Sequence, residues 1–329
     1  MADPTRILLV GCGRMALNHV NGLQAVPELG QIVAGVDPSE EARTHLQAEH
    51  GISAVFADLH DALRTVEAEA DIIAVPNFLH TEYTLACLRS GKHTLIEKPM
   101  ALNLQDVDQM IEVAEAEGKL LMAGQSQRFS NSIRYVKLLL DAGAVGKVRH
   151  VIHRRLGSSR GGDENSWFSK QVQSGGILPG IGVHSLDVLL WWLNEKATTV
   201  SAIVQNIDPH PEIDIEDETS LVATTESGII LNVALSFHHK AGTDWTVMGD
   251  DGVLHLHGTS GPLLLNGEEQ TVPAQVTLPG EPQIHREFLT AIRDSRPLAQ
   301  AAAQDVRKTM ALIFAAMESG KTGQTVAVS

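Results

Sequence analysis

The feature of this sequence that most constrains its fold is a glycine turn near the N-terminus. Residues 11–16 read Gly-Cys-Gly-Arg-Met-Ala, between an apolar run at 7–10 and a stretch of helical character at 15–24. In such a turn Gly11 permits the sharp bend, Gly13 lets the backbone approach a pyrophosphate, and Ala16 lets the helix pack on the strand. The helix N-terminus then faces the phosphates. The order strand, turn, helix therefore predicts a dinucleotide site.

An acidic residue at the expected distance supports this interpretation. Asp37 follows the second apolar run and lies 24 residues beyond Gly13. A carboxylate about 20 residues after such a turn binds a ribose hydroxyl of the dinucleotide. It would also repel a 2′-phosphate, and no arginine stands beside Asp37 in the sequence. We therefore expect NAD rather than NADP, with Arg14 and Met15 of the following helix also contacting the cofactor.

The chain divides into two parts that differ in their pattern of apolar and polar residues. In the first part, short apolar runs alternate with amphipathic stretches such as 39–49 and 104–117. The apolar runs are 7–10, 32–36, 72–75, 94–96 and 120–123. This alternation predicts a doubly wound parallel sheet of the Rossmann type. After a helix near 130–140, strand-like runs follow at 148–156, 199–204, 219–225, 229–236, 245–248 and 253–257. Several alternate polar with apolar residues, which favours a large, mostly antiparallel open sheet with helices at the end of the chain. We expect an α/β protein with a cofactor domain at 1–122 and a second α/β domain at 123–329.

Composition excludes several classes of partner. With 40 acidic and 25 basic residues, the net charge of −15 disfavours nucleic acid. No apolar run approaches the roughly 20 residues that span a bilayer, and no leader precedes the first strand, so we expect a cytoplasmic protein without a membrane partner. His255 and His257 fall on one side of a strand, but no carboxylate or cysteine accompanies them at metal-binding spacing. We expect no metal.

Three further motifs identify a family. They read Val-Pro-Asn-Phe-Leu-His at 75–80, Glu-Lys-Pro at 97–99, and Gly-Gly-Ile-Leu-Pro-Gly-Ile-Gly-Val-His-Ser-Leu-Asp at 175–187. In this order, and with the glycine turn, they resemble the Gfo/Idh/MocA family of oxidoreductases. The resemblance implies an active site between the two domains, and an open sheet in the second domain that joins subunits as a homodimer or homotetramer.

The resemblance also implies roles for single residues. Asn77 and His80 would lie near the nicotinamide half of the cofactor, although His80 also fits a purely structural role at a helix start. Glu97 would hold the nicotinamide-side ribose, and Lys98, before a cis proline, would reach the reacting carbon. Members of the family commonly read Asp-x-Gly-x-His where this chain has Gly180-Ile181-Gly182-Val183-His184. The lysine and histidine of the catalytic set are present, and the aspartate is replaced by Gly180.

Oxidation of a secondary alcohol needs a hydride acceptor, which is the cofactor, and a proton acceptor. A histidine titrates near neutral pH without help. We therefore expect His184 to exchange the proton while Lys98 binds the substrate oxygen; the reverse assignment is the alternative. Asp187 lies three residues after His184, so the two share a helix face. It either orients the imidazole or packs locally.

The substrate site is less well marked. Arg128 matches a family arginine at the domain junction, where it either binds substrate or joins the domains. Strand alternation sends one of Arg154 and Arg155 towards the site, and we choose Arg155. In the loop 157–174, Trp167 stands near Arg160, Asp163 and Asn165, a combination that suits a sugar face and its hydroxyls; packing of the tryptophan is the alternative.

The sequence thus predicts an NAD(P)-dependent dehydrogenase. Its expected reaction is hydride transfer between nicotinamide and a secondary alcohol or ketone of a sugar, inositol or related polyhydroxylated compound. Two alternatives keep the cofactor. One is glycoside hydrolysis or elimination through transient oxidation. The other is a non-enzymatic sensor of NAD and sugar.

Overall fold

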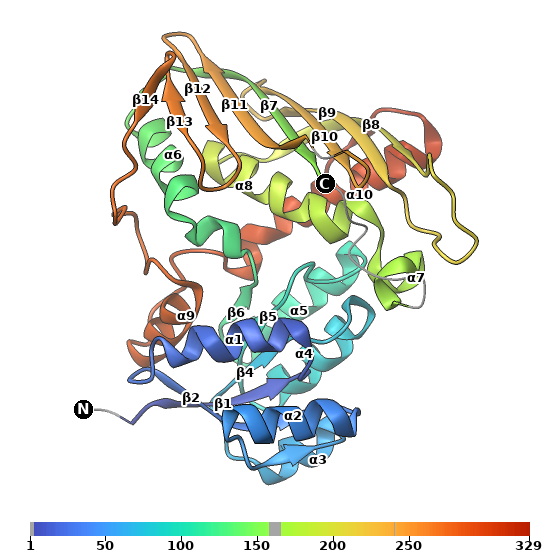
Figure 1. Cartoon of the computed structure of the whole chain (residues 1–329), viewed down its shortest axis with the longest axis vertical. Coiled ribbons are helices and arrows are strands. Elements are labelled where there is room, and N and C mark those ends of the chain that lie inside the picture. The colour runs from blue at the N-terminus through green and yellow to red at the C-terminus, as the bar shows by residue number, and fades with distance from the viewer. Residues whose placement is uncertain (1–2, 158–165, 240) are drawn as a thin grey trace. The chain divides into compact units, whose positions relative to one another are not determined.

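The computed structural model describes residues 3–157, 166–239 and 241–329. The chain forms two compact units (Figure 1). The first consists of Met1–Ala101, Gln105–Gly124 and Pro279–Asp305, and the second of Leu102–Leu104, Gln125–Leu278 and Val306–Ser329. Residues 279–305 therefore belong to the first unit, although the sequence analysis placed them in the second domain.

The first unit is built on a six-stranded sheet in the order β3-β2-β1-β4-β5-β6. All neighbouring strands pair in parallel. This is the strand order of a dinucleotide-binding fold. The strands are β1 (Thr5–Val10), β2 (Gly30–Val36), β3 (Val55–Phe56), β4 (Ala70–Ile73), β5 (His93–Ile96) and β6 (Leu121–Ala123). The doubly wound sheet is confirmed, and only the two-residue β3 was not foreseen.

Helices connect these strands, as parallel pairing requires. They are α1 (Arg14–Gln24), α2 (Glu40–His50), α3 (Leu59–Thr65), the short η1 (Asn77–Leu79), α4 (His80–Arg89) and α5 (Leu104–Ala116). The N-cap of α2 is Ser39, whose Oγ accepts a hydrogen bond from Ala42 N at 3.3 Å. Gly51 ends the same helix in the left-handed region. A further helix, α9 (Ile284–Arg293), comes from the C-terminal part of the chain.

The second unit contains a nine-stranded sheet in the order β14-β13-β12-β11-β7-β10-β9-β8-β15. Its strands are β7 (Val148–Leu156), β8 (Ala197–Gln205), β9 (Glu218–Thr225), β10 (Ile230–Ser236), β11 (Gly242–Gly249), β12 (Val253–His257), β13 (Leu263–Leu265), β14 (Glu268–Gln270) and β15 (Val326–Ala327). Among the described strands of this nine-stranded sheet, only β7 and β10 pair in parallel. The mostly antiparallel sheet is confirmed, but β13 and β14 were not among the strand-like runs identified in the sequence.

Helices pack on one face of this sheet (Figure 1). They include α6 (Asn131–Asp141), α8 (Val183–Leu193) and α10 (Ala303–Thr322), with the short η2 (Ser126–Phe129), η3 (Trp167–Ser169) and α7 (Gln171–Ser174) nearby in sequence. His153 Nε2 of β7 lies 2.7 Å from Ser185 Oγ of α8, and Ala202 N of β8 donates to Ser319 Oγ of α10 at 2.9 Å. These contacts fix which side of each strand faces the helices.

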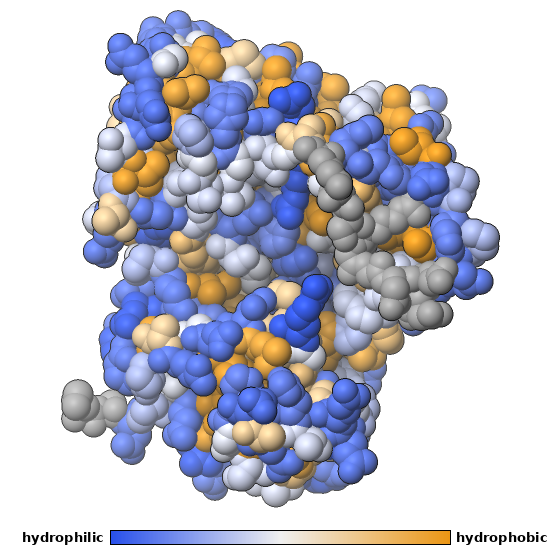
Figure 2. Space-filling model, in the orientation of Figure 1, coloured by the Kyte–Doolittle hydropathy of each residue, from blue (hydrophilic) through white to orange (hydrophobic). Residues whose placement is uncertain are grey.

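Apolar side chains are mostly inside the two units, and hydrophilic residues predominate on the face seen in Figure 2. One helical stretch, Gln171–Leu193, is long and apolar enough to cross a membrane by length and composition, but 78% of its most apolar window is buried. Such burial is that of a core helix. In the second unit the exposed apolar residues include Ile152, Ile203, Val222, Ile230 and Val253, all on strands of the sheet.

Candidate active site

The glycine turn lies at the carboxyl edge of the parallel sheet, directly after β1. Gly11 has φ +89°, and a Cβ there would lie 2.4 Å from the carbonyl oxygen of Ala74, so only glycine fits. A Cβ at Gly13 would meet nothing within 4 Å. Gly13, Arg14 and Met15 are exposed, and α1 begins at Arg14 without a side-chain cap. The turn therefore fits a pyrophosphate, which would bind at the helix N-terminus.

Asp37 follows β2 at the same edge. Its Oδ2 accepts a hydrogen bond from Cys12 N at 2.8 Å, and its Oδ1 accepts one from Ser39 N at 2.8 Å. The carboxylate thus supports the glycine turn, and each oxygen keeps a further lone pair for a ribose hydroxyl. No arginine stands next to Asp37 in the sequence, but the fold brings one to it from α2. Arg43 of α2 turns back, and its Nη1 donates to the carbonyl oxygens of Asp37 at 2.7 Å and Pro38 at 2.9 Å.

Asn77 and His80 follow β4 and are both buried, at 6% and 0% exposure. His80 lies with Nδ1 2.7 Å from the oxygen of Pro99 and Nε2 3.0 Å from that of Val75. Burial lowers the pKa of His80, so the ring is neutral and donates one hydrogen bond. His80 therefore lies between the loop after β4 and the loop after β5, and it donates to a carbonyl oxygen of one loop while it contacts that of the other.

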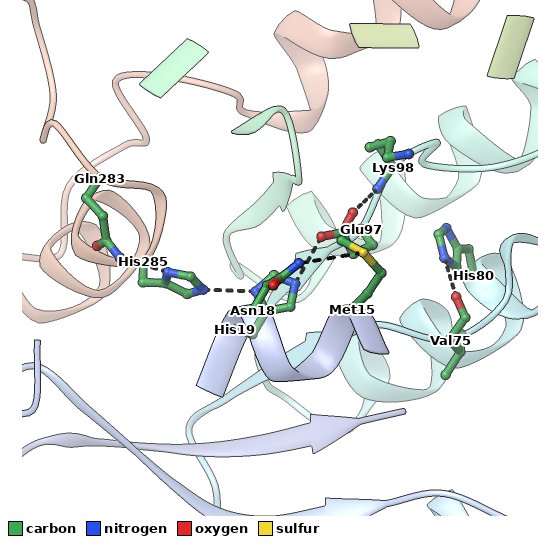
Figure 3. Close-up of polar contacts among 9 residues, drawn as sticks. All are labelled: Met15, Asn18, His19, Val75, His80, Glu97, Lys98, Gln283 and His285. Atoms are coloured by element: carbon green, nitrogen blue, oxygen red, sulfur yellow. Dashed lines mark hydrogen bonds and ion pairs between the residues drawn. The ribbon is translucent and has the colours of Figure 1, made fainter. Parts of the chain in front are cut away.

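Glu97 and Lys98 follow β5 and are partly buried (Figure 3). The bond between Lys98 and Pro99 is cis, as the resemblance implies. Glu97 Oε2 accepts a hydrogen bond from the backbone N of Lys98 at 3.1 Å, and Oε1 lies 3.1 Å from His19 Nε2. Sequence analysis overlooked His19 and its neighbour His285. The only signal was a polar residue, His19, on the inner face of α1.

In the second unit, His184 is the second residue of α8 and is partly buried. A π-helical turn, Leu178–Gly182, precedes it. Such turns are rare and are found frequently at functional sites. Gly180 lies in this turn and is buried. A Cβ at this position would lie 2.9 Å from Cζ of Phe168, so an aromatic ring takes the space beside the glycine.

Arg128 and Asp187 form a buried ion pair. Arg128 Nε donates to Asp187 Oδ2 at 2.7 Å and Nη2 donates to Oδ1 at 2.6 Å, and both side chains are 1% exposed. Thr309 Oγ1 also donates to Oδ1, at 3.1 Å. This geometry corresponds to the packing alternative for Asp187.

Arg155 and Trp167 are both partly buried. Arg155 lies two residues after His153 on β7 and so faces the same side as α8, whereas Arg154 faces away and pairs with Asp244. Burial lowers the pKa of Arg155. Trp167 stacks edge-on against Phe168 at 5.7 Å between ring centroids. The other loop residues considered above, Arg160, Asp163 and Asn165, lie outside the described residues.

The structure brings a carboxylate to the two histidines of β12. Asp244 of β11 pairs in register with His257, and its Oδ1 lies 2.9 Å from His257 Nδ1. One ligand atom each from Asp244, His255 and His257 lies within 4.8 Å of the others. The reasoning that no carboxylate accompanies these histidines is therefore corrected. Asp244 Oδ2 is already paired with Arg154 at 2.9 Å, so ion pairing accounts for the cluster without a metal.

Comparison with known proteins gives consistent matches to both units. The model of the NAD-binding Rossmann fold of the GFO/IDH/MocA oxidoreductase family matches residues 5–125, and that of the family's C-terminal domain matches residues 133–255. Inositol 2-dehydrogenase 2 of Saccharopolyspora erythraea is 27% identical over 254 residues, covering 76% of this chain and 72% of that protein. The 4-carboxy-2-hydroxymuconate-6-semialdehyde dehydrogenase of a Sphingobium species is 27% identical over 300 residues, covering 88% and 91%.

Solved structures share the whole fold. The WlbA dehydrogenase from Bordetella pertussis, determined with NADH and UDP-GlcNAcA, aligns with a TM-score of 0.88 over 99% of both chains at 21% identity. Together with the two family matches, the order of the motifs and the geometry at the sheet edge lead to one assignment. The chain belongs to the Gfo/Idh/MocA family and is an NAD-binding oxidoreductase.

Proposed function

We propose that this enzyme transfers a hydride between the nicotinamide of NAD and a secondary alcohol or ketone of a sugar, inositol or related polyhydroxylated compound. The observation that carries the proposal is the sheet edge of the first unit. Gly11, Asp37 and the pair Glu97-Lys98 follow three parallel strands at their carboxyl ends. This is where dinucleotides bind in such sheets. The names of the inositol and WlbA dehydrogenases support the substrate class.

In the proposed mechanism the bound cofactor supplies the hydride acceptor. Glu97 holds the ribose next to the nicotinamide, and Lys98 binds the substrate oxygen and stabilises its developing negative charge. His184 accepts the proton of the hydroxyl group when the alcohol is oxidised and returns it in the reverse direction. Arg155 and Trp167 bind the remaining hydroxyls and the apolar face of the substrate.

The roles of Lys98 and His184 are tested by the pH dependence of turnover. We expect Lys98→Met to abolish turnover at every pH. We expect His184→Ala to lower kcat by about 10²–10⁴, the usual contribution of a positioned acid or base. If His184→Ala retains most of kcat between pH 6 and 9 while Lys98→Met is inactive, the two roles are reversed.

We propose NAD as the preferred cofactor, because the Asp37 carboxylate repels a 2′-phosphate. We further propose that the first unit binds the cofactor and that the second binds substrate and joins subunits. The occupant of the open sheet face is a second copy of this chain, giving a homodimer or homotetramer. Exposed apolar residues on strands β7, β8, β9 and β10 support this proposal. We also propose a cytoplasmic enzyme without a nucleic-acid partner; the net charge of −15 supports the second point, because it would repel a phosphate backbone.

A further inference from the structure

A chain of hydrogen bonds in the first unit connects the N-terminus of α9 to Glu97 (Figure 3). Gln283 Nε2 lies 2.9 Å from His285 Nδ1, and His285 Nε2 lies 2.9 Å from His19 Nδ1. His19 Nε2 in turn lies 3.1 Å from Glu97 Oε1. The two imidazoles are 4% and 5% exposed. The proposed mechanism uses neither of them.

Gln283, at one end of the hydrogen-bond chain, determines which atom donates and which accepts in these bonds. This residue is the N-cap of α9, and its Oε1 accepts a hydrogen bond from Arg286 N at 2.7 Å. Its amide nitrogen therefore faces His285 and also donates to the carbonyl oxygen of Gly22 at 3.2 Å. Because an amide nitrogen only donates, Nδ1 of His285 accepts and the ring carries its hydrogen on Nε2.

The Glu97 end requires the same direction. Burial by itself would raise the pKa of Glu97, but the hydrogen bond from His19 and the charge of Lys98 outweigh it and lower that pKa below its usual value. The carboxylate only accepts, so His19 donates from Nε2. The Nε2–H group of His285, which the Gln283 end fixes, then makes Nδ1 of His19 the acceptor. Burial lowers the pKa of His285 to about 3, which keeps this ring neutral with a single N–H group. Both ends thus lead to one arrangement of hydrogens.

A glycine in α1 makes room for this arrangement. A Cβ at Gly22 would lie 2.2 Å from Cε1 of His285, so any other residue would displace the ring. Glycine inside a helix costs about 1 kcal/mol relative to alanine. The chain therefore accepts a less stable α1 at the position where His285 reaches His19.

We propose that His19 and His285 are positioning residues that hold the Glu97 carboxylate in one orientation for the cofactor. His19 fixes Oε1, and the Lys98 backbone fixes Oε2. His285 fixes the tautomer of His19, because a donor at His285 Nε2 leaves His19 Nδ1 only the role of acceptor. The functional part of this inference rests on the proposed role of Glu97 as a ribose ligand.

Two variants of His285 and a control test the effect on the cofactor by NADH fluorescence titration of the full-length protein. His285→Leu removes the donor, and His285→Gln replaces it with an amide that reaches His19. Leu289→Ala, a buried residue on the same helix, removes packing without a polar partner. We expect His285→Leu to weaken NADH binding about tenfold, the upper end of the value of one lost hydrogen bond between neutral groups, and the other two variants to weaken it less than threefold. Equal losses in His285→Leu and Leu289→Ala, or no loss in His285→Leu, would overturn the proposal.

A measurement on the cofactor-free protein tests the chain itself. ¹⁵N-histidine NMR distinguishes the two tautomers, and His19→Gln and His285→Gln assign the signals. We expect both rings to carry hydrogen on Nε2. An Nδ1–H tautomer at either ring contradicts the inference whatever the cofactor does. If the tautomers are as expected but the wild-type protein binds no NADH, the proposed function fails and the hydrogen-bond chain stands.

Discussion

The ring of Phe168 occupies the space beside Gly180, where a Cβ would lie 2.9 Å from Cζ. The same ring stacks edge-on against buried Phe237, at 6.4 Å between centroids. The position where the family resemblance implies an aspartate is thus a glycine covered by an aromatic cluster in this chain. Apolar aromatic side chains therefore surround position 180, and no carboxylate at this position can interact with His184.

Gly180→Ala should destabilise the protein because the added methyl group overlaps this ring. We expect a loss of about 1–3 kcal/mol in the free energy of unfolding, the usual cost of an overpacked core. Phe168→Leu in the same chain should recover most of the loss, since the smaller side chain gives way. Urea denaturation of the two single variants and the double variant measures the coupling. Strictly additive losses would show that Phe168 and position 180 are not in contact.

Breaking the buried ion pair between Arg128 and Asp187 should cost stability before it costs catalysis. Asp187→Ala removes the carboxylate that both Nε and Nη2 of the buried guanidinium contact, and we expect a loss of about 3–5 kcal/mol in the free energy of unfolding. The double variant Arg128→Met/Asp187→Leu should be more stable than Asp187→Ala, because neither charge remains. If Asp187→Ala instead keeps the wild-type stability and raises KM for substrate, the residue binds substrate directly.

Asp71 should make the stability of the protein depend on pH. Burial raises the pKa of Asp71 to about 8, against the lowering effect of hydrogen bonds from Cys87 and Thr94. The folded state therefore binds a proton more tightly than the unfolded state, whose carboxyl titrates near pH 4. Protonation of Asp71 therefore contributes fully to the free energy of unfolding below about pH 4, and this contribution is lost as the pH rises to about 8.

Asp71→Asn mimics the protonated carboxyl and removes this dependence. We expect the variant to gain stability over the wild-type protein as the pH rises from 5 to about 7.5, by about 1.4 kcal/mol for each pH unit, and to gain no more above about pH 8. Urea denaturation at several pH values provides the comparison. A constant difference between variant and wild type over this range would mean that Asp71 is ionised in the folded protein.

Cofactor preference should depend on Asp37 and Arg43 together. Asp37→Ser removes the charge that repels a 2′-phosphate and leaves the Arg43 guanidinium beside the site. We expect the ratio of kcat/KM for NADP to that for NAD to rise at least tenfold. The double variant Asp37→Ser/Arg43→Leu should lose most of that gain. If the single and double variants behave alike, Arg43 has no part in cofactor choice.

Local patterns in the sequence predicted most of the fold. The glycine turn and the apolar runs placed β1, β2, β4, β5 and β6, because a buried parallel strand is apolar along its whole length. Short elements such as β3 and α3 were not predicted, because a segment of two to seven residues is too short to show a periodic pattern. The strands β13 and β14 lie in a stretch rich in proline and glycine, which looks like a loop in any single sequence.

Contacts between distant residues could not be predicted. His19 and His285 are 266 positions apart, and Arg128 and Asp187 are 59 apart. No local sequence pattern indicates that residues 279–305 join the first unit. The hydrogen bonds between His285 and His19 could therefore not be predicted. Arg43 was missed for a related reason, because only the bend between β2 and α2 brings its side chain back to Asp37. The motifs indicated the candidate site residues in the sequence. Only the tertiary structure shows which of these side chains form ion pairs or hydrogen bonds with other residues of the chain.

The most direct test of the proposed function follows absorbance at 340 nm with a panel of inositols, aldoses and nucleotide sugars, supplied with NAD and NADP in parallel. We expect saturable formation of NADH with at least one polyhydroxylated compound, a weaker reaction with NADP, and no reaction in Lys98→Met. Consumption of a glycoside without net NADH, or binding of NAD and sugar with no reduction by any compound, would contradict the proposed dehydrogenase and favour elimination or a sensor.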